Sequence, residues 1–201
     1  MLIWRTINSS CPHLSWSRLD ASGLKLNGSE HTIELLADGV QIDLGAIGKG
    51  YAADKIGELL HKWSIDTALI SAGQSTILPV GVPRGLKGWP LTLSDPTDYS
   101  RVLAKIYLAD FAVSASGLQK GAHIINPRSG KPVKRKLAAW ATAKTASTGR
   151  LTAAAADALS TAFMVMSVDD IRTFCATYDD TSAFIILPAK KKGSANRVKW
   201  G

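Results

Sequence analysis

The sequence is poor in the features that define several protein classes. It has two cysteines, Cys11 and Cys175, which lie far apart and show no metal-ligand spacing. Neither a disulfide framework nor a cysteine metal site is therefore expected. No apolar run is long enough for a membrane span, and none has the form of a signal peptide. On this basis we expect no membrane segment and a cytoplasmic location.

The charge balance is basic, with a formal net charge of +8. The basic residues form two clusters, Lys131, Lys134, Arg135 and Lys136, and Lys190, Lys191, Lys192, Arg197 and Lys199. Basic clusters can bind nucleic acid, but these lack interleaved aromatic residues, and no nucleic-acid module is present. We therefore expect solvated surface or attraction for an anionic ligand, and no nucleic-acid partner. Nucleic-acid binding stays open as an alternative that depends on charge alone.

Length and patterning indicate one domain of mixed structure. The 201 residues, 46% of them apolar, suffice for a single core. We predict one domain over 1–189, with an irregular lead-in over 1–15 and a basic flexible tail over 190–201. Apolar runs at 32–36 and 40–44 flank an Asp-Gly pair, which predicts a hairpin. Helical spacing begins at Gly48, and 152–166 is an alanine-rich helix, so the fold is α+β or α/β.

Three separated segments carry the residues suited to chemistry. The first, 43–54, reads DLGAIGKGYAAD, a glycine-rich turn with a lysine before a helix, where an anion can bind. A tight turn that needs glycine for its backbone angles explains the same residues. The second, 114–117 and 121–132, reads SASG and GAHIINPRSGKP. It contains His123, a candidate general base, although a lone histidine is more often structural.

The third segment, 155–162, reads AADALSTA. On a helix, Asp157 and Thr161 are four residues apart, so their oxygens project from one face. Together with a nearby carbonyl they would suit Mg²⁺. Taken alone, an ordinary helix acid and threonine explain this pair equally well.

In this order, the segments resemble the hallmark stretches of the ApbE family. Those stretches are D-L-G-G-I-A-K-G-Y-A-x-D, T-S-G followed by H-I-I-D-P-x-T-G-x-P, and A-D-A-x-S-T-A. The turn Ala72-Gly73-Gln74-Ser75 resembles the family's N-x-G-G-S, and Ser94-Asp95-Pro96 resembles a strand-end D-P. The resemblance runs from about residue 16 to about residue 187. It implies an α+β fold with mixed, largely antiparallel sheets and packed helices.

The resemblance also implies a reaction, FAD:protein FMN transfer. FMN moves from FAD to a Thr or Ser hydroxyl of an acceptor protein, with Mg²⁺ bound and AMP released. The implied metal ligands are Ala46, Asp157 and Thr161. The implied FAD contacts are Asp43, Lys49, Ser116, Gly117, His123 and Ile125, and His123 is the implied catalytic base.

Several positions depart from the family pattern. Ala46 replaces a glycine, Asn126 replaces an aspartate, and Gln74 replaces the second glycine of its turn, where it could crowd the flavin. The family also has a substantial N-terminal region ahead of residue 16 that this sequence lacks, so we expect an N-terminally shortened domain. Two further functions therefore stay open. They are Mg²⁺-dependent hydrolysis of FAD to FMN and AMP, and flavin binding without turnover.

Overall fold

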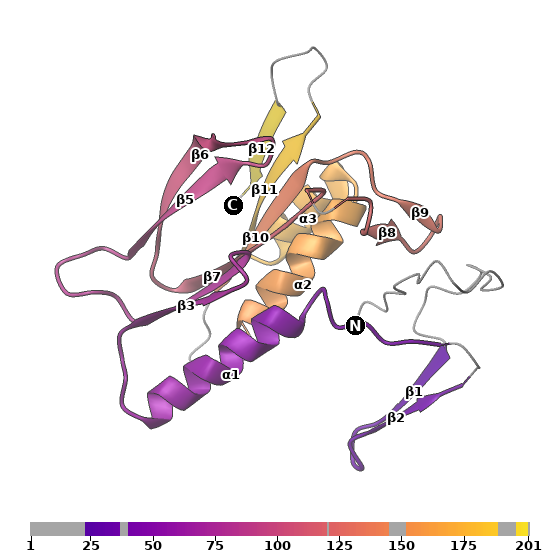
Figure 1. Ribbon diagram of the computed structural model, residues 1–201, viewed down its shortest axis with the longest axis horizontal. Coiled ribbons are helices and arrows are strands. Elements are labelled where there is room, and N and C mark those ends of the chain that lie inside the picture. Colours follow the sequence, from indigo (N-terminus) through magenta and orange to yellow (C-terminus); the bar gives the residue numbers. More distant parts are fainter. Residues whose placement is uncertain (1–22, 37–39, 120, 145–151, 189–195, 201) are drawn as a thin grey trace.

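The computed structural model describes residues 23–36, 40–119, 121–144, 152–188 and 196–200. Their strands pair antiparallel throughout, and three helices pack against the largest sheet (Figure 1). The predicted α+β fold with largely antiparallel sheets and packed helices is confirmed. No helix in the described part of the chain has the length and apolar character that a membrane crossing requires.

A six-stranded sheet forms the centre of the fold, in the order β12-β11-β10-β7-β4-β3. Its strands are β3 (Ala68–Ala72), β4 (Thr76–Val80), β7 (Phe111–Gly117), β10 (Ala138–Lys144), β11 (Thr181–Leu187) and β12 (Asn196–Trp200). Side chains of β10 alternate between the two faces, as strand geometry requires. Ala139 and Ala141 belong to the hydrophobic core, whereas Ala138 and Trp140 line a cleft. One face of the sheet thus holds the core, and the other contributes to the site.

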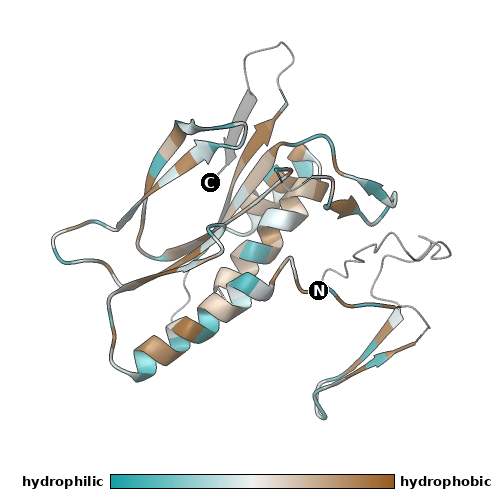
Figure 2. Cartoon of the chain, in the orientation of Figure 1, coloured by the Kyte–Doolittle hydropathy of each residue, from teal (hydrophilic) through white to brown (hydrophobic). Residues whose placement is uncertain are grey.

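Three helices cover the core face: α1 (Gly48–Lys62), α2 (Thr152–Val165) and α3 (Val168–Thr177). Helix α2 packs on β4, β7 and β10, α1 packs on β3, β4 and α2, and α3 packs on β11. Hydropathy along α1 is mixed (Figure 2), and burial along the helix is also mixed, since Ala53 is fully buried while Leu59 is exposed. Helix α3 begins with a capping box, in which Ser167 and Asp170 bond each other's backbone N–H.

The contact between α1 and α2 is unusually close at Gly50. A Cβ atom at this position would lie 2.1 Å from the carbonyl oxygen of Ala153. Glycine at position 50 therefore sets the separation of the two helices. That separation brings the first turn of α1 against the polar face of α2.

Three two-stranded sheets complete the fold: β1 (Leu24–Asn27) with β2 (Thr32–Leu35), β5 (Trp89–Asp95) with β6 (Asp98–Leu108), and β8 (Ile125–Asn126) with β9 (Lys131–Pro132). Asp95 closes the β5–β6 turn by accepting bonds from the backbone N–H and hydroxyl of Thr97. The β5–β6 ribbon contributes Thr92, Ser94, Pro96 and Tyr99 to the cleft.

The predicted hairpin between 32–36 and 40–44 is wrong. Strand β2 pairs instead with β1, and residues 40–44 form no strand. The turn that decides this pairing contains Asn27-Gly28, a strong hairpin dipeptide. The Asn27 Oδ1 accepts from the backbone N–H groups of Ser29 and Glu30 and stabilises the turn. The Asp-Gly pair at 38–39 lies outside the described residues.

Two expectations for the basic residues also need correction. Residues 196–200 of the predicted flexible tail form β12 and pair with β11, while residues 190–195 and 201 lie outside the described residues. Lys136 does not belong to a solvated cluster, because it is only 4% exposed. Its Nζ donates to the carbonyl oxygens of Met164 and Met166 at the C-terminal end of α2. Burial lowers the pKa of Lys136.

Candidate functional site

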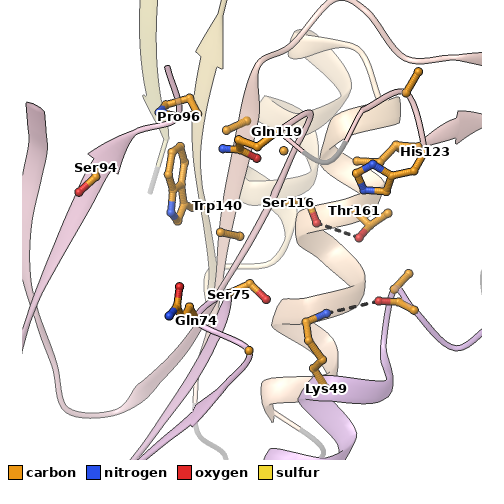
Figure 3. A pocket seen from close by; sticks show the side chains of 18 of the residues that line it. Lys49, Gln74, Ser75, Ser94, Pro96, Ser116, Gln119, His123, Trp140 and Thr161 are labelled. Carbon is orange, nitrogen blue, oxygen red and sulfur yellow. Dashed lines mark hydrogen bonds between the residues drawn. The ribbon is translucent and has the colours of Figure 1, made fainter. Parts of the chain in front are cut away.

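A cleft of about 930 Å³ lies where the glycine-rich loop, α1, α2 and the outer face of β7 and β10 meet (Figure 3). Nearly all the residues that the sequence analysis selected line it, namely Asp43, Ala46, Lys49, Ser116, Gly117, His123, Ile125 and Thr161. They come from segments up to 118 positions apart, Asp43 to Thr161. Asp157, the remaining selected residue, lies beneath the cleft and contacts Lys49.

The carboxylate of Asp43, a residue of the glycine-rich loop, stabilises the conformation of that loop. The Asp43 Oδ1 accepts from the backbone N–H of Gly45 at 2.6 Å, and a Cβ atom on Gly45 would lie 2.9 Å from that oxygen. Position 45 therefore requires glycine while Asp43 keeps this contact. The loop leads directly into α1, whose second residue, Lys49, donates back to the carbonyl of Gly45 at 3.4 Å (Figure 3).

Asp157 is the centre of the polar network under the cleft, and it is 1% exposed. Its Oδ1 accepts from the hydroxyls of Thr76 at 3.2 Å and Ser114 at 3.0 Å. Its Oδ2 accepts from the backbone N–H of Gly50 at 3.0 Å. The Lys49 ammonium lies 3.2 Å from Oδ1 and 3.3 Å from Oδ2. A buried carboxylate requires partners of this kind, because burying a polar group without hydrogen bonds is costly.

A chain of hydroxyls continues along the same face of α2. The Ser116 Oγ lies 2.8 Å from Ser160 Oγ and 2.9 Å from Thr161 Oγ1 (Figure 3). Ser160 in turn donates to the backbone carbonyl of Asp157 at 2.9 Å. The Ser116 hydroxyl thus contacts the face of α2 that carries Asp157 and Thr161. The two hydroxyls that it contacts, those of Ser160 and Thr161, lie 44 and 45 residues away in sequence.

His123 has a defined tautomer when it is neutral. Its Nδ1 lies 3.0 Å from the backbone carbonyl oxygen of Gly121. A carbonyl oxygen only accepts, so Nδ1 carries the proton and Nε2 holds the lone pair. The ring is exposed and lines the cleft. The Nε2 atom is therefore available as a base toward a molecule bound there.

The oxygens around this cleft match the preferences of Mg²⁺. Ala46, Asp157 and Thr161 would offer a carbonyl, a carboxylate and a hydroxyl, all hard ligands. Among the described residues, no group of three or more His, Cys, Asp or Glu side chains could hold a metal ion. A single carboxylate nevertheless fits Mg²⁺, which commonly takes one or two carboxylates and completes its shell with substrate phosphates and water.

A second acid, which is not among the residues that line the cleft, links the two helices. Both carboxylate oxygens of Asp54, in α1, accept from the first turn of α2, at 2.9 Å from Ala153 N and 2.8 Å from Ala154 N. Burial raises the pKa of Asp54, although these N–H groups act in the opposite direction. Its role is to cap α2, which the sequence motif alone did not reveal.

Other site residues escaped the sequence analysis. Thr76 contacts Asp157 from β4 and lies in none of the selected segments. Ser114 contacts it from β7 and lies in the 114–117 segment, but the sequence analysis gave it no role. Trp140 lines the cleft on the outer face of β10 and packs edge-to-face on Phe184, with ring centroids 5.5 Å apart. Alternation along β10 was the available signal, since it places Trp140 opposite the buried alanines.

Two departures from the family pattern have clear structural outcomes. Gln74 adopts a left-handed conformation with φ of 61°, beside Gly73 with the same φ of 61°, in the β3–β4 turn. Its side chain is exposed and lines the cleft. Asn126 keeps its role as a turn former, because its Oδ1 accepts from the backbone N–H of Arg128 at 2.9 Å.

Comparison with known proteins matches this arrangement. The ApbE family pattern covers residues 5–185. A protein named FAD:protein FMN transferase from Treponema pallidum is 29% identical over 194 residues, which cover 86% of this chain and 52% of that protein. A Haemophilus influenzae protein of the same name is 26% identical over 166 residues, covering 77% of this chain and 46% of its own length. This chain thus spans about half the length of these relatives.

Solved structures give the same result. The ApbE protein of Thermotoga maritima superposes with a TM-score of 0.73 at 26% identity, covering 90% of this chain and 59% of that one. The flavin transferase ApbE of Vibrio cholerae has a TM-score of 0.75 at 21% identity, covering 92% and 58%, and this likeness concerns the fold alone. Because the family pattern matches residues 5–185, nearly the whole of this chain, the chain belongs to the ApbE family.

Proposed function

We propose that this chain is an FAD:protein FMN transferase, which moves FMN from FAD to a Thr or Ser hydroxyl of an acceptor protein and releases AMP. The observation that supports it best is the cleft itself, where His123, Lys49 and the Asp157–Thr161 face of α2 meet. The names of the relatives agree with this proposal. FAD is then the substrate, and an acceptor protein is the partner.

The geometry suggests a division of tasks. Asp43, Ser116, Gly117 and Ile125 would contact FAD along the cleft. Lys49 would offset charge on the pyrophosphate. Ala46, Asp157 and Thr161 would hold Mg²⁺, which when bound supplies Lewis-acid neutralisation of the phosphate oxygens. This metal dependence belongs to the proposal and not to the observations.

His123 would activate the acceptor. Its Nε2 takes the proton of the acceptor hydroxyl as the hydroxyl oxygen attacks the phosphorus of the FMN half. A phosphorus–oxygen bond to that acceptor forms, the phosphoanhydride bond breaks, and the bridging oxygen leaves with AMP. The hydrogen bond from Nδ1 to the carbonyl of Gly121 leaves the lone pair of the neutral ring on Nε2, the atom that would accept the proton. The same base could activate water, and the exposure of His123 to solvent favours hydrolysis of FAD as the second candidate reaction.

The test is an incubation of the chain with FAD and Mg²⁺, with and without an acceptor domain that contains a Thr or Ser target. AMP and FMN are quantified, and the acceptor is examined by mass spectrometry and in-gel flavin fluorescence. We expect AMP together with flavinylated acceptor. AMP with only free FMN would make the chain a hydrolase, and flavin binding without AMP would make it a binding module.

Variants separate the assigned roles. His123→Ala should lower transfer by about 10²-fold or more while FAD binding persists. Asp157→Asn should abolish Mg²⁺-dependent turnover of FAD, while keeping the shape of the buried side chain. Lys55→Met serves as the matched control, because Lys55 pairs with Glu58 on the exposed side of α1. The predicted cytoplasmic location stays a prediction, which fractionation of the native cells would check.

A further inference from the structure

The Lys49 ammonium lies between two groups that are suited to a cation. It is 3.2 Å and 3.3 Å from the carboxylate oxygens of Asp157 and 3.4 Å from the carbonyl oxygen of Gly45. Asp157 and the 45–46 loop are also the groups expected to bind Mg²⁺ in the proposed function. The ammonium of Lys49 therefore uses the same negative charge that a metal ion would need.

The carboxylate of Asp157 has little capacity left for another ligand. An ionised carboxylate offers about four lone-pair sites, and four donor groups already contact Asp157, the Lys49 ammonium through both oxygens. A metal ion can bind only after a donor leaves. The Gly50 N–H belongs to the backbone of α1, and Thr76 and Ser114 are fully buried. Lys49 is on a flexible side chain that is 37% exposed, so it is the donor able to leave.

A released Lys49 has a place to go. The residue lines the cleft, and its chain passes over Gly73, where a Cβ atom would lie 3.3 Å from Lys49 Cδ. A glycine here leaves room for the lysine stem to turn. The freed ammonium would then face the cleft, where the pyrophosphate of a dinucleotide offers negative oxygens.

We infer that Lys49 is a tethered counter-ion, which pairs with Asp157 in the metal-free chain and transfers to the ligand's pyrophosphate when a divalent cation replaces it. This inference rests on the proposed function, since it uses the metal and FAD sites named there. It adds that the two binding events are coupled through one side chain. Metal binding frees the lysine for FAD, and FAD binding by the lysine frees Asp157 for the metal.

The experiment measures Mn²⁺ binding by electron paramagnetic resonance in the absence of FAD. Lys49→Met removes the competing ammonium and should bind Mn²⁺ about tenfold more tightly than the wild-type chain. Lys49→Arg, which keeps a tethered cation, should not reproduce this gain. Lys55→Met, which removes a lysine elsewhere on α1, should bind like the wild type. Equal or weaker Mn²⁺ binding by folded Lys49→Met would overturn the inference.

A second measurement does not depend on the stability of the Lys49→Met variant. In the wild-type chain, Mg²⁺ alone should change the side-chain ammonium NMR signal of Lys49, and should leave that of Lys55 unchanged. An unchanged Lys49 signal at saturating Mg²⁺ would count against the exchange. The FAD affinity should also rise on adding Mn²⁺ by a larger factor in the wild type than in Lys49→Met, and equal factors would refute the coupling.

These results are separable from the proposed function. A tenfold gain in Mn²⁺ affinity without any flavinylation would support the counter-ion role and reject the transferase. Flavinylation by the wild type, together with unchanged Mn²⁺ affinity in Lys49→Met, would do the reverse.

Discussion

Asp54 and Asp157 each cap the helix that carries the other. Asp54, in α1, accepts from the Ala153 and Ala154 N–H groups in the first turn of α2. Asp157, in α2, accepts from the Gly50 N–H in the first turn of α1. Helix α1 has no side-chain cap of its own at Ile47, so the acid of the neighbouring helix supplies one. The contacts that pack α1 against α2 therefore also position Asp157 in the candidate site.

The loss of Asp54 should destabilise the fold. Asp54→Ala leaves two buried N–H groups of α2 without an acceptor, which we expect to lower the free energy of unfolding by about 1–3 kcal/mol. Urea denaturation at neutral pH measures the change. Glu58→Ala, at an exposed position of the same helix, is the control and should have little effect. Equal stability of the two variants would mean that water replaces the Asp54 cap.

Asp54 should also give stability a specific pH dependence. Burial raises the pKa of Asp54 above its ordinary value of 3.8. Between these two pKa values the native chain binds more protons than the unfolded chain, so the contribution of Asp54 to stability falls as pH rises. The free energy of unfolding of Asp54→Asn minus that of the wild type should therefore increase from about pH 4 toward neutrality. A difference that stays flat or decreases over this range would contradict a raised pKa for Asp54.

The helix contact at Gly50 should tolerate no side chain. In Gly50→Ala the new methyl group meets backbone 2.1 Å away, and we expect a loss of about 3 kcal/mol or more. Since α1 must shift, the proposed binding of Mg²⁺ at Asp157 should weaken as well. Gly57→Ala is the matched control in the same helix, because its Cβ atom would meet only the ends of side chains, the Leu78 Cδ2 at 3.2 Å and the Ile70 Cδ1 at 3.8 Å. It should change stability by less than about 1 kcal/mol. Thermal denaturation of both variants measures the two changes in stability.

The buried Lys136 should stabilise the end of α2. Lys136→Met keeps the aliphatic stem but removes the donor to the carbonyls of Met164 and Met166, with an expected loss of about 1–2 kcal/mol. Lys134→Met, at an exposed neighbouring position, should be neutral. Denaturant titration at pH 7 compares them. A more stable Lys136→Met would show that the cost of burying the ammonium exceeds the gain from both bonds.

The left-handed turn at Gln74 should be improved by glycine. Gln74→Gly relieves a side chain at φ of 61° and should raise the free energy of unfolding by about 1 kcal/mol. Ser64→Gly, at φ of 56°, should stabilise the chain similarly. Gln74 lines the cleft and Ser64 does not, so Gln74→Gly should also bind FAD more tightly. Fluorescence titration with FAD separates the two variants, and equal FAD affinities would exclude crowding by Gln74.

The sequence was informative where the signal is local. Helical spacing identified α1 and α2 almost to their ends, and the motifs identified Lys49, His123 and Thr161, which line one cleft. The sequence was less informative where the residues in contact lie far apart along the chain. Thr76 and Ser114 contact Asp157 at separations of 81 and 43 residues, and no local pattern predicts such contacts. The β1–β2 hairpin was missed because a second turn signal, at 38–39, competed with Asn27-Gly28.

The contacts of Asp157 have a consequence for how the chain folds. Its partners Lys49, Gly50, Thr76 and Ser114 lie 108, 107, 81 and 43 residues away in sequence. Closing loops of this length has an entropic cost that is recovered only when distant segments dock. We therefore expect the contacts of Asp157 to form late in folding, once the sheet and both helices have docked. We also expect a chain that lacks any one of these segments to lose part of the hydrogen-bond network around Asp157.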